Sequence, residues 1–244
     1  MNGTVFTLTL RQFFGQRRSL LLFLLAIVPL GLAIIYRVGD HLDQHDWTAN
    51  VLLDGIVITT VLPLACLILG TAALGSEIED GTAVHILAKP IPRLDIIIAK
   101  FAASALIVAA FVIPAAAVST LIAVSGTSES GLTSAIVIST AVGVIAYTAV
   151  FIFLSILSSR SLLFGLAYVF IWEGLVTSLF GGTRVISIRQ YCLGIADLIT
   201  TVDTDIFEAE LNGIAALALA ATVTAFALYL ATRRLQRLEL TETD

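Results

Sequence analysis

The stretch "DIIIAKFAASALIVAAFVIPAAAVSTLIAV", from Asp95 to Val124, decides the fold of this chain. Beyond Lys100 it carries no charged side chain. A helix needs about 20 mostly apolar residues to cross the ~30 Å hydrocarbon core of a bilayer. Lipid offers no partners to backbone N–H and C=O groups, and a helix satisfies those groups internally. The stretch therefore predicts a transmembrane helix over residues 95–124.

Five further stretches of the chain have the same apolar character. They lie near residues 19–37, 51–74, 132–157, 161–181 and 211–231. Of the 244 residues, 58% are hydrophobic and 13% are charged, and the mean hydropathy is +1.01. Soluble domains are about 45–50% apolar and about 25% charged. We expect an all-α, polytopic membrane protein with six transmembrane helices that form a single transmembrane domain over residues 1–244.

The basic residues are distributed unevenly between the two ends of these helices. If the N-terminus is cytoplasmic, ten of the 13 Lys and Arg residues fall on the cytoplasmic side. These ten are Arg11, Arg17, Arg18, Lys89, Arg93, Lys100, Arg160, Arg233, Arg234 and Arg237. Cytoplasmic loops of membrane proteins carry an excess of Lys and Arg. The pattern therefore predicts a multi-pass protein of the cytoplasmic membrane with both termini in the cytoplasm.

Two segments outside the six stretches also have helical patterns. Near the N-terminus, Phe6, Leu10, Phe13 and Phe14 have helical spacing among basic neighbours. This spacing predicts an interfacial helix within residues 1–18, and a cytosolic extension of the first span is the alternative. The long extracytoplasmic loop over residues 182–210 is rich in apolar residues, which predicts short helices on or dipping into the outer surface.

The segment "GSEIEDGTAVHILAKPIPR", from Gly75 to Arg93, is the largest predicted cytoplasmic loop. Thr82 can cap a short helix over residues 83–88, and the two following prolines prevent that helix from continuing. One side of this helix would be apolar and the other charged. Such an element can dock against another protein, and a plain solvated connector is the alternative.

This segment resembles the cytoplasmic signature of permeases of the ABC-2 type transporter family. The residues that carry the resemblance are, in order, Glu77, Gly81, Thr82, Leu87, Pro90, Ile91, Arg93 and Lys100. Ala99 stands where the family often has glycine. In the fifth apolar stretch, Ile171-Trp172-Glu173-Gly174 is similar to the Trp-Glu-Gly pattern of the family. The basic N-terminus and the six stretches extend the resemblance over the whole chain.

The resemblance implies a permease subunit that moves a substrate across the membrane, in the direction of export. Its protein partners would be two copies of a cytosolic ABC ATPase and a second permease, which is either another copy of this chain (a homodimer) or a close paralogue. The ATPase subunits would hold ATP and Mg. Membrane lipids would surround the complex. Residues 75–93 would form a coupling helix region that transmits motion of the ATPases to the spans. The coupling residues so implied are Glu77, Gly81, Thr82, His85, Ile86, Leu87, Pro90 and Arg93.

Glu173 is an ionisable residue inside the fifth apolar stretch, where a charge costs about 2.5–3.5 kcal/mol. One residue in every four, namely Gly165, Val169, Glu173, Thr177 and Gly181, defines a small polar face suited to close helix packing. Glu173 and Thr177 could line a translocation path, or Glu173 could be a protonated acid hydrogen-bonded to a neighbouring span. Asp54, near the outer end of the second stretch, is expected to be a solvated helix-end acid.

The chain lacks the sequence signals of catalysis. It contains neither G-x-x-x-x-G-K-[ST] nor H-E-x-x-H. We therefore expect no enzyme, no cofactor and no metal in this chain, and no nucleic-acid partner. His41 and His45 lie among acids that could bind a cation, but a solvated outer loop is favoured. The alternative function is a standalone secondary transporter or channel with Glu173 as its protonation site. The scarcity of intramembrane charges and the lack of an internal repeat argue against this alternative.

Overall fold

A computed structural model describes residues 6–9, 17–39, 44–79, 92–125, 131–158, 160–200 and 211–241. All regular secondary structure in these ranges is helical. The longer helices are α2 (Arg17–Val38), η1 (Trp47–Val61), α4 (Leu62–Glu79), α6 (Arg93–Ala123), α7 (Leu132–Leu157) and α11 (Gly213–Thr241). The shorter ones are α3 (Gln44–Asp46), α8 (Ser161–Ala167), η2 (Tyr168–Val176), α9 (Thr177–Leu179), η3 (Gly181–Ile186) and α10 (Ile188–Ile199).

Five helical segments are long and apolar enough to cross a membrane. They are Ser19–Val38, Trp47–Gly75, Arg93–Ala123, Leu132–Leu157 and Gly213–Gln236. The second of them is the continuous run of η1 and α4. These five segments agree with five of the six apolar stretches of the sequence, so the chain is an all-helical, multi-pass membrane protein.

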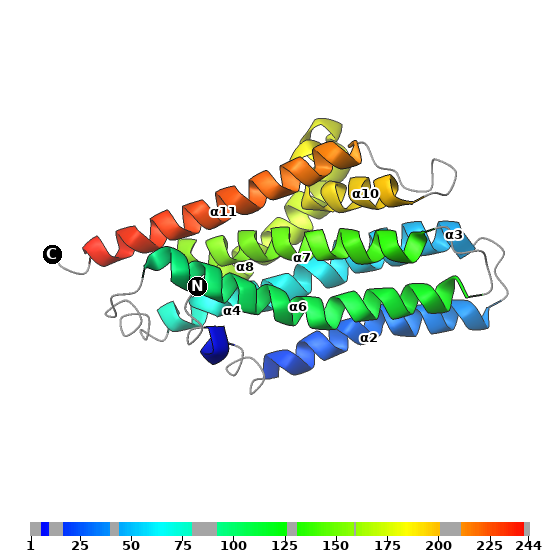
Figure 1. Cartoon of the computed structure of the whole chain (residues 1–244), viewed down its shortest axis with the longest axis horizontal. Coiled ribbons are helices and arrows are strands. Elements are labelled where there is room, and N and C mark those ends of the chain that lie inside the picture. The colour runs from blue at the N-terminus through cyan, green and yellow to red at the C-terminus, as the bar shows by residue number, and fades with distance from the viewer. Residues whose placement is uncertain are drawn as a thin grey trace.

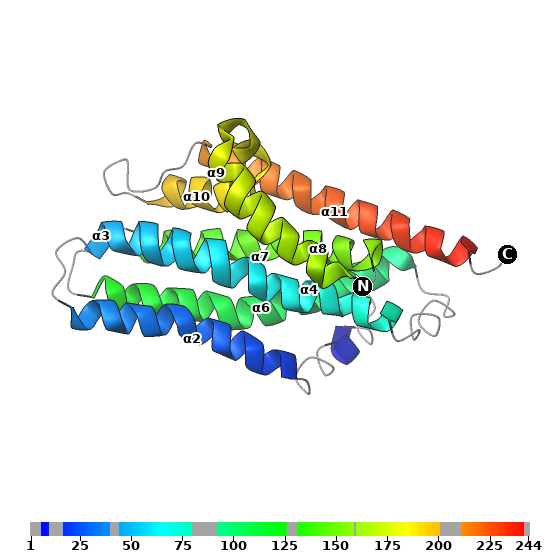
Figure 2. The ribbon, with the colours of Figure 1, turned by 180° about the vertical axis from the view of Figure 1, so that it is seen from behind.

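The fifth apolar stretch, predicted as a span over residues 161–181, forms a shorter apolar helix, Ser161–Val176. In Figure 2, the run from α8 to α9 crosses the bundle obliquely. The run ends because Phe180 has extended backbone angles (φ −122°, ψ 101°), after which η3 begins at Gly181. This helix is apolar but shorter than the five helical segments that are long enough to cross a membrane, so a sixth span stays a prediction.

Helix α7 lies at the centre of the molecule, between α4, α6, α10 and α11 (Figures 1 and 2). Its buried face contains small residues, including Ser139, Gly143, Ala146 and Ala149. Small residues let neighbouring helices approach closely in a membrane protein. At Gly143 an added Cβ would lie 2.5 Å from Leu62 Cδ2, so α7 and α4 leave no room there for a side chain.

Two parts of the bundle, η1 and η2, are π-helices, in which a backbone N–H bonds to the carbonyl five residues earlier. Leu62 N–H donates to Val57 O at the end of η1, and Thr177 N–H donates to Trp172 O at the end of η2. A π turn includes one residue more than an α turn, so it changes the face on which later side chains lie. The sequence patterns did not predict these segments.

The segment after the fifth apolar stretch, predicted as an extracytoplasmic loop, folds into η3 and α10, and residues 201–210 lie outside the described ranges. Helix α10 packs between α7 and α11. A Cβ added to Gly213 would lie 2.4 Å from Leu198 Cβ and 2.6 Å from Gly194 O. Because the backbones of α10 and α11 meet here, glycine is needed at the start of α11.

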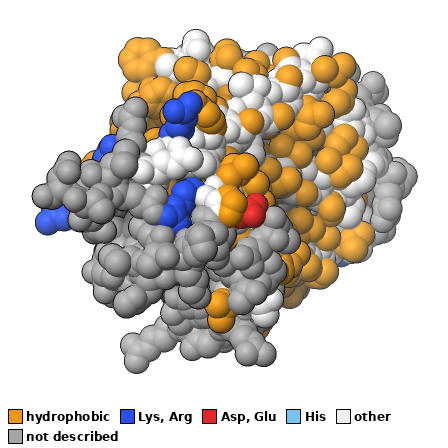
Figure 3. All heavy atoms as spheres, turned by 60° about the vertical axis from the view of Figure 1, so that its left-hand side comes forward, with side chains coloured by type: hydrophobic (Ala, Val, Ile, Leu, Met, Phe, Trp, Pro, Cys, Tyr) orange, Lys and Arg blue, Asp and Glu red, His pale blue; other side chains and the backbone are white. Residues whose placement is uncertain are grey.

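The ends of the helices divide the molecule into two poles. The starts of α2, α6 and α8 lie at the same pole as the ends of α4, α7 and α11 (Figure 1). In Figure 3, which turns this pole toward the viewer, Lys and Arg side chains lie beside an extensive hydrophobic side. We call this the basic pole, and the opposite one, which holds α3 and α10, the α10 pole.

Of the predicted interfacial helix over residues 1–18, the structure describes a short helical turn at residues 6–9 and the first residues of α2. Residues 1–5 and 10–16 lie outside the described ranges.

Candidate functional site

The predicted coupling segment lies between the end of α4 and the start of α6. Glu77 belongs to the last turns of α4, and Arg93 is the first residue of α6. Pro92 precedes α6 with φ −55° and ψ 131°, so its own backbone is not helical and α6 begins at the next residue. Gly81, Thr82, His85, Ile86, Leu87 and Pro90, together with the side chain of Glu77, lie outside what the structure describes. The coupling role of these residues stays a prediction.

Lys100 connects the two helices that flank this segment. Its side chain is 1% exposed, and Nζ donates a hydrogen bond of 2.5 Å to the backbone carbonyl of Ala73 in α4. An ammonium group buried in this way needs such acceptors, because its desolvation is costly. The end of α4 and the first two turns of α6 are therefore held together by a polar contact inside the protein.

Glu173 lies in η2 and is 2% exposed, and both oxygens of its carboxylate accept hydrogen bonds. Oε1 accepts from the Ile188 backbone N–H at 2.9 Å and from the Tyr168 hydroxyl at 3.0 Å. Oε2 accepts from the Ser187 hydroxyl at 2.5 Å. Three donors therefore converge on one carboxylate, which satisfies a buried acid that would otherwise be costly.

Two of those donors belong to the start of α10. Ser187 is the N-cap residue of this helix, with extended angles (φ −96°, ψ 124°), and its Oγ also accepts from the Gln190 N–H at 3.3 Å. The N-terminus of a helix has unpaired N–H groups and a positive dipole end, both of which favour a nearby carboxylate. Glu173 therefore joins η2 to α10, whereas sequence reasoning considered a neighbouring span as its partner.

The helix face that the four-residue spacing predicted in the fifth apolar stretch is buried from Gly165 to Thr177. Gly165, Val169, Glu173 and Thr177 all point into the protein. Thr177 Oγ1 donates to the backbone carbonyl of Glu173 at 2.6 Å, which is a contact within its own helix. A Cβ added to Gly165 would lie 2.1 Å from Leu67 Cδ1, so this face packs closely against α4. A path-lining role for Glu173 and Thr177 stays a prediction.

Asp54 was expected to be a solvated acid, and that interpretation is wrong. Its two carboxylate oxygens accept from Arg189 Nε at 2.7 Å and from Arg189 NH2 at 2.5 Å. The Asp54 side chain is 21% exposed and that of Arg189 is 25% exposed. The hydrogen bonds to Asp54 raise the pKa of Arg189 above its usual value. A bidentate ion pair therefore joins η1 to the first turn of α10.

We call Asp54, Glu173, Ser187 and Arg189 the α10 cluster. Two acids from two different apolar segments hold the same helix terminus in this cluster. Sequence reasoning missed Ser187 and Arg189 as functional candidates. The S-x-x-Q spacing of Ser187 and Gln190 is a helix-start signal that could have found the cap. No comparable signal pairs Arg189 with Asp54, because 135 positions separate them.

The described residues contain no group of three or more His, Cys, Asp or Glu side chains that could hold a metal ion. Of the outer-loop residues considered as cation ligands, His45 falls within the described ranges and His41 outside them. The polar contacts that the structure describes at this pole include the hydrogen bonds and the ion pair of the α10 cluster.

The fold and the α10 cluster define a class: a multi-pass helical membrane protein in which α10 is fixed to the membrane-spanning helices. A comparison with protein families gives a match to the ABC-2 family transporter protein over residues 16–189, which is more than half of the chain. The chain belongs to the ABC-2 transporter family. No curated protein matches it. Permeases of this family are generally non-catalytic membrane subunits that typically work with an ATPase partner.

Proposed function

We propose that this chain is the membrane-spanning subunit of an ABC transporter that exports a substrate across the cytoplasmic membrane. Two copies of a cytosolic ABC ATPase supply the energy, and they hold the ATP and Mg. A second permease copy forms the other half of the translocation path. The match to the ABC-2 family over residues 16–189 carries this proposal.

The proposed orientation puts the basic pole in the cytoplasm. Arg93 begins α6, Arg160 immediately precedes α8, and Arg233 and Arg234 lie near the end of α11. An excess of basic residues on one side of short loops favours the cytoplasm for that side. With Ser161–Val176 as a short sixth span, both termini are cytoplasmic and the α10 pole faces outward.

The proposed coupling mechanism uses the two helices that flank residues 75–93. A rigid, proline-bounded element seated on the ATPase would move when the ATPases close. The Lys100–Ala73 hydrogen bond joins α4 and α6 beside this element, so a displacement would reach both helices together. The central helix α7 packs against α4 and α6, which gives the displacement a route through the bundle.

The alternative of a standalone transporter that uses Glu173 as a protonation site receives no support from the geometry. Glu173 is 2% exposed and already accepts three hydrogen bonds. Three hydrogen bonds from Tyr168, Ser187 and Ile188 fix both oxygens of this side chain in one position, as in a structural contact. We therefore interpret Glu173 as a structural acid that fixes α10.

The test co-expresses the chain with candidate ABC ATPases, beginning with any that is encoded beside its gene. Co-expression and purification should yield a stable complex whose ATP hydrolysis depends on the permease. The substitution Ile86→Arg should abolish the coupled ATP hydrolysis, because it adds a charge to the predicted apolar side of the coupling helix. Val84→Arg is the matched control, since it makes the same chemical change outside that apolar side.

Membrane insertion of both variants is checked by size-exclusion chromatography in detergent. Failure of the wild-type chain to bind any ABC ATPase would overturn the proposed function. Equal ATP hydrolysis in the wild type and in Ile86→Arg would be compatible with a permease function but would contradict the coupling role proposed for residues 75–93.

A further inference from the structure

A groove at the basic pole lies between the last turns of α7 and of α11. Its volume is about 420 Å³, within the range of about 300–1,000 Å³ that is usual for small-molecule sites. The residues that line it are Phe153, Leu157, Tyr229, Leu230, Arg233 and Arg234. We call it the α7–α11 groove.

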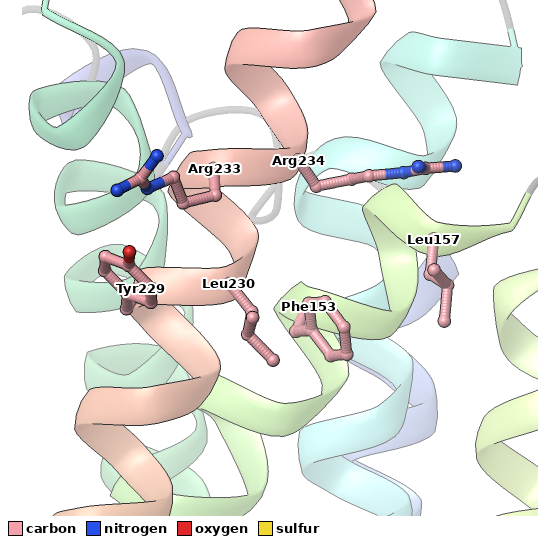
Figure 4. Close-up of a pocket in the computed structure, with 6 residues that line it drawn as sticks. All are labelled: Phe153, Leu157, Tyr229, Leu230, Arg233 and Arg234. Carbon is pink, nitrogen blue, oxygen red and sulfur yellow. The ribbon is translucent and has the colours of Figure 1, made fainter.

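The groove has an apolar wall and a cationic rim (Figure 4). Phe153 of α7 and Leu230 of α11 lie side by side between the two helices. Above them, Arg234 extends toward α7, and the guanidinium of Arg233 lies 5.2 Å from the centroid of the Tyr229 ring. None of the six lining residues is acidic, so the two arginines give a net positive charge to the residues that line the groove.

Both arginines are exposed, and neither forms an ion pair within the described part of the chain. Arg233 has a cation–π contact, which leaves its N–H donors available. A guanidinium group has five donors in a planar fork that matches the oxygens of a phosphate. The rim therefore has the chemistry of a phosphate site.

The groove also lies at the ends of two candidate spans, where lipid headgroups are expected. It is formed by the last residues of the Leu132–Leu157 span and by the last residues of the Gly213–Gln236 span. Arginine at the end of a membrane helix extends toward the headgroups, while its methylene stem stays against apolar surface. Leu157 and Tyr229 are about half exposed beside this rim, where acyl chains would lie.

We propose that the α7–α11 groove binds an anionic phospholipid of the inner leaflet. Arg233 and Arg234 contact its phosphate, and Phe153, Leu157 and Leu230 contact the upper part of its acyl chains. A free phosphate ion would use the rim but leave the apolar wall exposed to water. The choice of the inner leaflet rests on the proposed orientation, whereas the site itself rests on the groove.

The test uses the full chain purified in detergent, without any ATPase. The protein is mixed with equal amounts of phosphatidylglycerol and phosphatidylcholine, and the bound lipids are counted by native mass spectrometry. The wild type should prefer phosphatidylglycerol. Arg233→Gln and Arg234→Gln should each lower this preference about fivefold, which is the contribution expected of one basic residue at an anionic surface.

Arg160→Gln is the matched control, because Arg160 is an exposed arginine at the same pole that does not line the groove. It should keep the wild-type preference. The proposal is overturned if Arg160→Gln lowers the preference as much as Arg234→Gln does, since the effect is then general surface charge. It is also overturned if an excess of glycerol 3-phosphate displaces the lipid, since the site then binds a soluble phosphate. Neither result bears on ATPase coupling.

Discussion

The arginine of the α10 cluster and the two arginines of the α7–α11 groove have opposite environments. At the α10 pole, Arg189 is three-quarters buried and forms a bidentate ion pair with Asp54. At the basic pole, Arg233 and Arg234 are exposed, and neither forms an ion pair within the described ranges. The groups of the α10 cluster therefore satisfy one another, whereas the α7–α11 groove presents two exposed arginines to a molecule outside the chain.

This difference suggests how the two poles work. A buried network in which every group has a partner holds one arrangement, because breaking any contact leaves a costly unpaired group. The α10 cluster therefore keeps α10 fixed between α7 and α11. Exposed arginines contribute little to folding and remain available for binding. Substitutions at the two poles should consequently affect different measurements.

The largest expected effect is that of Glu173→Ala at the α10 pole. The change removes the acceptor of the Ser187 hydroxyl and the Ile188 N–H, both of which are buried. We expect the free energy of unfolding to fall by about 3 kcal/mol, as for buried donors left without partners. Unfolding by sodium dodecyl sulfate in mixed micelles measures it. Glu173→Gln keeps an acceptor oxygen, so its free energy of unfolding should fall by less. If Glu173→Ala is as stable as the wild type, the structural role of Glu173 is contradicted.

The second prediction compares glycine-to-alanine changes at the two poles. In Gly213→Ala the new Cβ meets the Gly194 carbonyl and Leu198 Cβ, which cannot move without a shift of α10. This overpacking should cost about 2 kcal/mol. In Gly75→Ala, at the basic pole, the nearest atom is Ser161 Oγ at 3.2 Å, which can rotate away, so we expect no loss. Equal losses in the same unfolding experiment would show that the poles are packed alike.

The third prediction concerns the ion pair of the α10 cluster. Arg189→Gln should lower the free energy of unfolding by about 1.5 kcal/mol, between the values of exposed and buried pairs. The pair is partly exposed, so solvent screens its attraction. A double-mutant cycle with Asp54→Asn isolates the coupling of the two side chains. If the two single losses simply add in the double variant, Asp54 and Arg189 do not stabilise the protein through each other.

The sequence was sufficient for the parts of this structure that depend on composition and on helical spacing. Five of the six apolar stretches correspond to helices long enough to cross a membrane, and the four-residue spacing from Gly165 to Thr177 predicted one buried face. It was insufficient for contacts between distant segments, such as Asp54 with Arg189. It also did not predict η1 and η2, because a search for α-helical spacing assumes that every turn has the same number of residues.

The smallest expected effect tests the contrast between the poles directly. Arg234→Gln makes the same chemical change as Arg189→Gln, yet in micelles without anionic lipid its stability should stay within about 0.5 kcal/mol of the wild type, because Arg234 is exposed. A ligand that binds the folded state stabilises it. Addition of phosphatidylglycerol should therefore stabilise the wild type and Arg189→Gln by similar amounts, and Arg234→Gln by less. An equal gain in all three proteins would mean that the lipid acts elsewhere than in the α7–α11 groove.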